Sequence, residues 1–215
     1  MKKYVLSLLS MFALTLFVAS PSNSEMRFGI MGSFGDIETS GTENEESGDK
    51  GSDANSTSFE EFFVAASVFA EMDLGDFLVI GVDYMPIGKE LGSGQRTDAT
   101  TDGNETTDDT GTYSASAEAD DMMSIYAHVN VGSSGYYGLV GYQEVDVSTS
   151  ETLPNSTYGD ASLDGMKYGL GYKTDNFRFE LVHSDFDDVT LNSTSGSSTV
   201  TADVDATYLS IGYNF

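Results

Sequence analysis

Apolar and polar residues alternate along several stretches of the chain, most regularly over its last ten residues. In an extended strand successive side chains point to opposite faces, so alternate residues share a face. A strand of a membrane barrel needs one apolar face toward lipid and one more polar face toward the lumen. We therefore predict a membrane-spanning strand over residues 201–215. Its outward face consists of Thr207, Leu209, Ile211, Tyr213 and Phe215.

The same alternation predicts seven further strands. Two ambiguous residues, Glu144 and Asp146, lie in a stretch where both parities carry tyrosine and valine, and we expect them to face inward or to lie above the membrane. Eight strands of this kind predict an all-β fold, an eight-stranded antiparallel up-and-down transmembrane β-barrel. The seven strands are Met26–Phe34, Phe59–Met72, Phe77–Met85, Met122–Val131, Tyr136–Val147, Gly165–Lys173 and Asn176–Phe186.

Long acidic connections alternate with very short ones. The long ones are residues 35–58, 87–121, 148–164 and 187–200, and the short ones are Leu74-Gly-Asp76, Gly132-Ser-Ser-Gly135 and Thr174-Asp175. An even number of strands puts both ends of the barrel domain and all short turns on one side. Outer-membrane barrels have short periplasmic turns and long extracellular loops, so this asymmetry favours that class.

A two-residue turn at Thr174-Asp175 also predicts a register. It would pair Tyr172 with Phe177 and Leu170 with Phe179, all on the outward face. In that register Gly169 and Gly171 lie opposite Glu180 and Arg178 and leave room for those long side chains.

Two segments resemble a known family. The ending with Leu209, Ile211, Tyr213 and Phe215 resembles the C-terminal assembly signal of bacterial outer-membrane β-barrels. Residues 168–186, with interleaved glycines and a Thr-Asp-Asn turn, resemble the last hairpin of small opacity-type and OmpA/OmpX-type barrels. The resemblance implies the outer membrane of a Gram-negative bacterium, with outer-membrane lipid, lipopolysaccharide and the barrel assembly machinery as partners. A soluble β-sandwich is the rival fold, since its strands alternate in the same way.

Residues 1–24 have the layout of a secretory signal peptide. Lys2 and Lys3 precede an apolar run from Tyr4 to Ala19, and Ser22-Asn-Ser24 provides small residues for cleavage. The barrel domain is then 25–215, and an uncleaved membrane anchor is the alternative.

Composition removes several classes of function. The formal net charge of −26 argues against a nucleic-acid partner, because phosphate contacts need a basic surface. The absence of cysteine excludes disulfides and thiolate sites. Nothing in the pattern indicates an oligomeric state.

Strand parity directs ionisable side chains toward the lumen. An eight-stranded barrel is only wide enough for side chains to fill it, and buried charges must pair. We expect a paired polar core that plugs the lumen, with Arg27 beside Glu71, and the alternative is a gated conductive path. The predicted lumen network is Arg27, Glu71, Asp83, His128, Lys167, Lys173, Arg178 and Glu180.

Signals for catalysis or for a cofactor are weak. His128 has no recognisable serine and acid partners, so we expect no enzymatic activity and no cofactor. Asp98, Asp102 and Asp109 follow part of a calcium-loop pattern, but its third position is threonine and no helices flank it. Diffuse attraction of Ca²⁺ or Mg²⁺ by the acidic loops is the broader expectation. These features favour a structural or surface-interaction role in the envelope, with a narrow channel or hydrophobic-ligand conduit as the alternative.

Overall fold

The structure is a computed structural model, and it describes residues 25–47, 51–98, 111–152, 157–194 and 198–215. The signal peptide predicted over residues 1–24 lies outside this part. No helix in the described ranges is long and apolar enough to cross a membrane. The strands are β1 (Met26–Ser47), β2 (Gly51–Leu74), β3 (Leu78–Asp98), β4 (Gly111–Asn130), β5 (Tyr136–Glu151), β6 (Ala161–Lys173), β7 (Phe177–Phe186), β8 (Val189–Asn192) and β9 (Ser198–Asn214).

The strands form one closed antiparallel ladder. Neighbours along the chain pair with one another from β1 to β7, β7 pairs with β9, and β9 pairs with β1 to close the sheet. The short β8 pairs only with β9, above the point where β7 ends, so it continues the seventh position of the barrel. The predicted eight-stranded up-and-down barrel is therefore correct.

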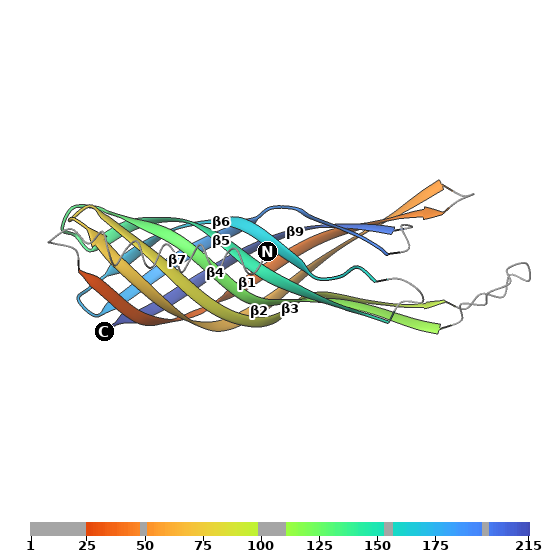
Figure 1. Cartoon of the computed structure of the whole chain (residues 1–215), viewed down its shortest axis with the longest axis horizontal. Coiled ribbons are helices and arrows are strands. Elements are labelled where there is room, and N and C mark those ends of the chain that lie inside the picture. Colours follow the sequence, from red (N-terminus) through yellow and green to blue (C-terminus); the bar gives the residue numbers. More distant parts are fainter. Residues whose placement is uncertain (1–24, 48–50, 99–110, 153–156, 195–197) are drawn as a thin grey trace, which may run out of the picture.

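The two ends of the barrel differ. One end, here the turn end, carries the tight connections β2–β3, β4–β5 and β6–β7 and both ends of the described barrel (Figure 1). There the Phe215 N–H donates to the Phe28 carbonyl at 2.9 Å, and the Asp73 N–H donates to the Glu25 carbonyl at 3.1 Å. At the opposite end, here the hairpin end, the β1–β2 and β3–β4 hairpins project as long arms (Figure 1).

The first two connections predicted to be long loops, residues 35–58 and 87–121, are mostly strands, which corrects that prediction for them. β1 continues to Ser47 and β2 begins at Gly51, while β3 reaches Asp98 and β4 begins at Gly111. Pairing in register along each hairpin satisfies the backbone polar groups, so these polar segments need little apolar surface to stay extended. Their inner face still contributes a few buried apolar side chains, such as Ile37.

The register of the β6–β7 hairpin also differs from the prediction. Lys173 pairs with Arg178, and the Thr174 N–H donates to the Phe177 carbonyl at 2.7 Å, so Asp175 and Asn176 occupy the centre of the turn. The Thr174 hydroxyl accepts a hydrogen bond from the Phe177 N–H at 3.1 Å, which favours this turn. The register thus shifts by two residues, which leaves every side chain on its predicted face.

The space beside the glycines of β6 is also used differently. Gly171 pairs with Glu180, but a Cβ at Gly171 would meet the hydroxyl of Tyr137 at 2.5 Å. Here the glycine makes room for the aromatic ring of β5, and not for Arg178 as we expected.

The outward face forms an apolar belt around the turn-end half of the barrel. Val64 and Leu170 are more than two-thirds exposed, and rings pair at the turn end, where Phe177 and Tyr213 lie 5.2 Å apart. A wide exposed apolar band is unfavourable in water and favourable in lipid. Along the strands the belt ends at outward-facing acids, which are Asp36, Glu60, Asp121, Glu144, Asp164, Asp185 and Asp205.

The structure shows which face of β5 points into the lumen, a question that the sequence left open. Tyr137, Leu139, Gln143 and Val145 are buried on the lumen side, and Glu144 lies on the opposite face. The inward alternative for Glu144 and Asp146 is therefore wrong.

Candidate functional site in the barrel lumen

Charged and aromatic side chains fill the lumen near the turn end. Arg178 on β7 forms an ion pair with Glu71 on β2, and the Tyr126 hydroxyl donates to the same carboxylate at 2.9 Å. Glu180 accepts a hydrogen bond from the Tyr137 hydroxyl at 2.6 Å. The group is named the lumen cluster, and its members are Arg27, Glu71, Asp73, Asp83, Ser124, Tyr126, His128, Tyr137, Lys167, Arg178 and Glu180.

His128 lies between the two central carboxylates. Its Nδ1 is 3.6 Å from Glu71 and its Nε2 is 3.5 Å from Glu180. Its ring stacks with those of Tyr126 and Tyr137, with centroid separations of 4.9 and 4.2 Å. The His128 side chain is 1% exposed, so it contacts protein groups and not bulk water.

A second buried ion pair lies beside the first. Lys167 Nζ donates to Asp83 Oδ2 at 2.6 Å and to Ser124 Oγ at 2.5 Å. In this way a cation of β6 joins an anion of β3 across the lumen. Both side chains are at most 4% exposed, which makes the pairing obligatory for both.

Arg27 has a different main partner from the one predicted. Its guanidinium donates two hydrogen bonds to Asp73, both 2.7 Å long, and lies 3.5 Å from Glu71. Lys173 is the remaining basic residue of the predicted lumen network. Its Nζ lies 5.7 Å from the centroid of the Tyr137 ring. The three cations of the lumen cluster and Lys173 thus equal in number the four carboxylates of the cluster, Glu71, Asp73, Asp83 and Glu180.

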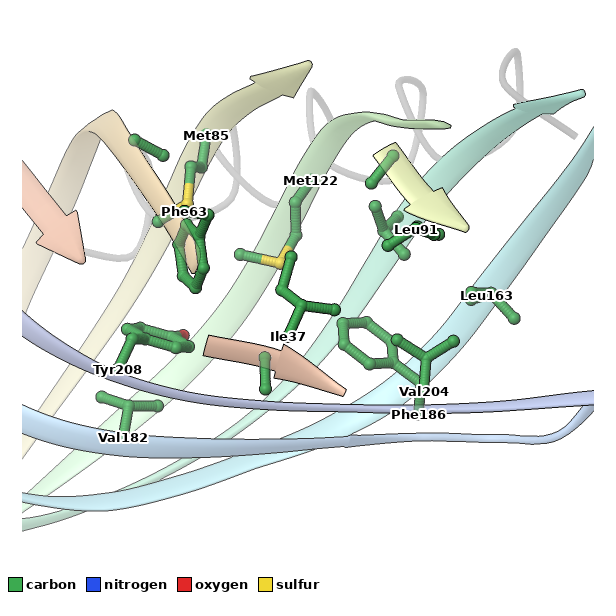
Figure 2. Close-up of a cluster of buried hydrophobic side chains, with 14 of the residues drawn as sticks. Ile37, Phe63, Met85, Leu91, Met122, Leu163, Val182, Phe186, Val204 and Tyr208 are labelled. Carbon is green, nitrogen blue, oxygen red and sulfur yellow. The ribbon is translucent and has the colours of Figure 1, made fainter. Parts of the chain in front are cut away.

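Apolar side chains fill the lumen toward the hairpin end. Figure 2 shows them pointing toward one another from the strands around them. The rings of Phe63 and Tyr208 meet edge to face at 5.7 Å, and Met85 is 2% exposed. The group is named the apolar chamber, and its members are Ile37, Phe63, Met85, Leu91, Met122, Val145, Val147, Leu163, Phe186, Val204 and Tyr208.

We did not predict the apolar chamber from the sequence. A signal was present in runs such as Phe62-Phe63-Val64-Ala65, where both parities are apolar. Because one face of this run meets the lipid, the other must line an apolar part of the lumen.

A cavity of about 350 Å³ lies among the strands of the hairpin end. Its apolar lining includes Leu91, Leu163 and Val204 of the chamber. Two carboxylates also line it: Glu43 accepts a hydrogen bond from the Tyr158 hydroxyl at 2.9 Å, and Glu151 accepts one from the Tyr158 N–H at 3.1 Å. Within the chamber itself the free volume is only about 30 Å³.

The barrel wall has a discontinuity between β2 and β3. Their pairing begins at Leu74 and Leu78 and ends at Val68 and Tyr84, whereas β1–β2 and β3–β4 pair far beyond that level. Figure 1 shows the two hairpins diverging there. The gap between residues 59–67 and 85–91 is named the β2/β3 seam.

The sequence of β3 accounts for the seam. Pro86 has no N–H to donate to a ladder, and Gly88 adopts a φ of 58°, which favours glycine. The β3–β4 register shifts between Pro86 and Lys89, which turns β3 away from β2. One ion pair spans the seam, from Lys89 Nζ to Glu61 Oε1 at 2.5 Å.

The other predicted residues do not join the lumen. Leu209, Ile211, Tyr213 and Phe215 face outward on the belt. Asp98 ends β3, and Asp102 and Asp109 lie outside the described residues. Among the residues that the structure describes, no three His, Asp or Glu side chains are placed to hold a metal ion.

No protein-family model and no curated protein matches the sequence. Among solved structures, the chain is similar to AlkL in lipid bilayers, with a TM-score of 0.49 and 12% identity over 91% of this chain and 94% of that one. It is also similar to OprG from Pseudomonas aeruginosa, with a TM-score of 0.47 and 13% identity over 88% and 95% of the two chains. The similarity to Neisserial surface protein A has a TM-score of 0.42 and 11% identity over 87% of this chain and 97% of that one.

The chain itself shows in which environment it folds. The strands close on themselves, so within the belt the described strands leave unpaired backbone edges at the β2/β3 seam alone, and the apolar belt surrounds them on the outside. The chain is a transmembrane β-barrel.

Proposed function

We propose that this barrel takes up small apolar molecules from outside the cell and delivers them to the membrane, without enzymatic chemistry. The apolar chamber and the cavity above it carry this proposal. In the proposed orientation the hairpin end faces outward and the turn end faces the periplasm, as in other barrels of this class. An apolar cavity that opens toward water is costly unless an apolar molecule occupies it.

The lumen cluster makes a straight passage to the periplasm unfavourable. Its two central ion pairs are nearly fully buried, so an ion or a polar solute would have to separate Arg178 from Glu71 or Lys167 from Asp83. Breaking a buried pair leaves an uncompensated charge, at a cost of about 3–5 kcal/mol. We therefore expect the lumen to be closed to ions.

The β2/β3 seam provides a sideways route out of the chamber. Phe63 and Met85 belong to the chamber and lie on the two strands that border the seam, and Val64 beside them faces outward on the belt. Elsewhere within the belt a molecule would have to break interstrand hydrogen bonds, which is costly in lipid. At the seam it meets no ladder and displaces only side chains.

The charges near the cavity indicate the class of molecule. Glu43 and Glu151 lie in its wall, and the chain as a whole carries a net charge of −26. Like charges repel, most strongly where water is excluded. Uncharged apolar molecules therefore fit this cavity, and fatty-acid carboxylates do not.

Cross-linking the seam tests the proposed route. The chain has no cysteine, so a Glu61→Cys/Lys89→Cys variant can be joined by a short bismaleimide where the native side chains touch. We expect the cross-link to slow transfer of N-phenyl-1-naphthylamine into proteoliposome bilayers at least tenfold, while the unlinked variant retains transfer. A matched control is Glu38→Cys/Glu60→Cys, which joins the paired strands β1 and β2. Equal transfer by all four preparations would contradict the route, and transfer no faster than in protein-free liposomes would contradict the function.

A further inference from the structure

A second cavity, of about 500 Å³, lies at the turn end beneath the lumen cluster. It is separate from the apolar chamber, and its lining is polar. Side chains from β1, β4, β5, β6, β7 and β9 converge on it, including those of Arg27, Asn130, Tyr137, Lys173, Arg178 and Asn214.

Hydrogen-bond acceptors in this lining are buried without a partner. Asn214 is 7% exposed, and its Oδ1 accepts no hydrogen bond from any described residue. The same is true of Asn130 Oδ1, although the Nδ2 of this residue donates to the Asp76 carbonyl at 2.8 Å. Buried polar atoms nearly always have a hydrogen-bond partner, so we expect a group in this cavity that donates hydrogen bonds to these two oxygens.

Donors and a positive charge in the same lining also lack a partner. Arg27 Nε is buried and donates to no described residue, although its terminal nitrogens are bound by Asp73. Lys173 Nζ has no carboxylate within 4.0 Å in the described part of the chain, and its nearest aromatic contact is Tyr137. Arg178, the third cation of the lining, is paired with Glu71. An anionic group that accepts hydrogen bonds would therefore also fit this lining.

A zwitterion carries both kinds of group. We infer that the turn-end cavity binds a small molecule with a free carboxylate and a free ammonium group, as in an amino acid or at the ends of a short peptide. The carboxylate pairs with Lys173 and Arg27 Nε, and the ammonium donates to Asn130 and Asn214. Glu25 and Asp175 line the same cavity and add negative charge for the ammonium. This site is independent of the apolar uptake proposed above.

Titration calorimetry of the folded barrel in detergent tests the site. The probes are alanine and dialanine, with N-acetylalanine and alaninamide as analogues that lack the ammonium or the carboxylate. We expect at least one of the two zwitterions to bind, and each single-charge analogue to bind at least tenfold more weakly. The better of the two zwitterions distinguishes a free amino acid from a peptide.

Two variants locate the binding. Lys173→Gln should weaken it at least tenfold, whereas Lys89→Gln, which removes a cation at the hairpin end, should leave it unchanged. Heat-modifiable gel mobility checks that both variants fold, and Asn214→Leu provides a second probe of the cavity if Lys173→Gln fails to fold. The inference is overturned if no zwitterion binds at millimolar concentration, if the analogues bind equally well, or if neither cavity variant changes the affinity.

Discussion

Arg178 on β7 and Glu71 on β2 stand 107 positions apart in sequence and form an ion pair in the middle of the lumen. Both side chains are at most 4% exposed, and Tyr126 and His128 contact the same carboxylate. Arg27, which we predicted as the partner of Glu71, is bound mainly to Asp73, where both side chains are more than one-fifth exposed. The charge that compensates Glu71 therefore comes mainly from the opposite side of the barrel.

Arg178→Ala should lower the free energy of unfolding by about 3–5 kcal/mol, because Glu71 would remain buried without its cation. Arg27→Ala should cost about 1 kcal/mol or less, since its pair with Asp73 is partly exposed to water. Urea titrations in the same detergent measure both. Equal losses for the two variants would show that Arg178 is not the main partner of Glu71.

Phe215→Asp should hinder membrane insertion far more than Asn214→Asp. Phe215 faces outward, is 76% exposed and contacts the ring of Tyr213 at 5.7 Å, whereas Asn214 faces the turn-end cavity. A charge on the lipid side of the belt is costly, while the lumen side tolerates polar groups. The folded fraction, read from heat-modifiable gel mobility after expression, compares the variants. If both insert equally well, the terminal aromatic is not an assembly signal.

Lowering the pH below neutral should stabilise the hairpin end around β8 and β9. Partial burial raises the pKa of Asp203, and the carboxylates of Asp205, Asp188 and Asp185 raise it further. A carboxyl group with a raised pKa in the folded state binds its proton more tightly there than in the unfolded chain. Its contribution to stability is thus present at low pH and is lost as the pH rises through the folded pKa.

Amide hydrogen exchange, corrected for intrinsic rates, measures this effect. Protection of β8 and the upper part of β9 should increase as the pH falls from neutral toward the range in which carboxyl groups titrate. The Asp203→Asn variant should lose most of this pH dependence. An unchanged dependence in the variant would assign the effect to other carboxylates.

Millimolar Ca²⁺ should protect the hairpin end from proteolysis, if divalent ions bridge its carboxylates to one another or to anionic lipopolysaccharide. The outward acids at the edge of the belt, such as Asp185 and the directly opposite Asp205, are suited to such bridging. The cleavage rate should fall in Ca²⁺ relative to chelator at matched ionic strength, while strands within the belt stay resistant in both. Equal rates would leave the acidic residues with no bridging role.

The strands within the belt were predictable because lipid and lumen impose a strict two-residue period. That period tolerates an error in the turn: moving its centre from Thr174-Asp175 to Asp175-Asn176 shifts the register by two and changes no face. The hairpin arms were missed because residues 35–58 carry few apolar side chains, and their ladder is held by backbone pairing that leaves no hydrophobic period.

The lumen was predictable only in part, for a related reason. Parity placed residues such as His128 and Glu180 on the inner face, but it cannot tell which inward charges meet across the barrel, so Asp73 was missed as the partner of Arg27. The apolar chamber was missed because Phe63 and Met85 follow no period of their own. Their neighbours Phe62 and Tyr84 are also apolar or aromatic, which hides the inner face.

The most direct test of the divided lumen uses the native methionines. Methyl NMR on methionine-labelled barrel in nanodiscs would report on Met85 and Met122 in the apolar chamber, on Met31 beside Arg178, and on the outward Met166. Adding a short alkane should shift the Met85 and Met122 signals in a saturable manner, with nuclear Overhauser contacts to the alkane, and leave Met31 unchanged. Met166 reports any unsaturable partitioning into lipid. Saturable shifts at Met31, or none at Met85 and Met122, would contradict an apolar binding site above a closed polar cluster.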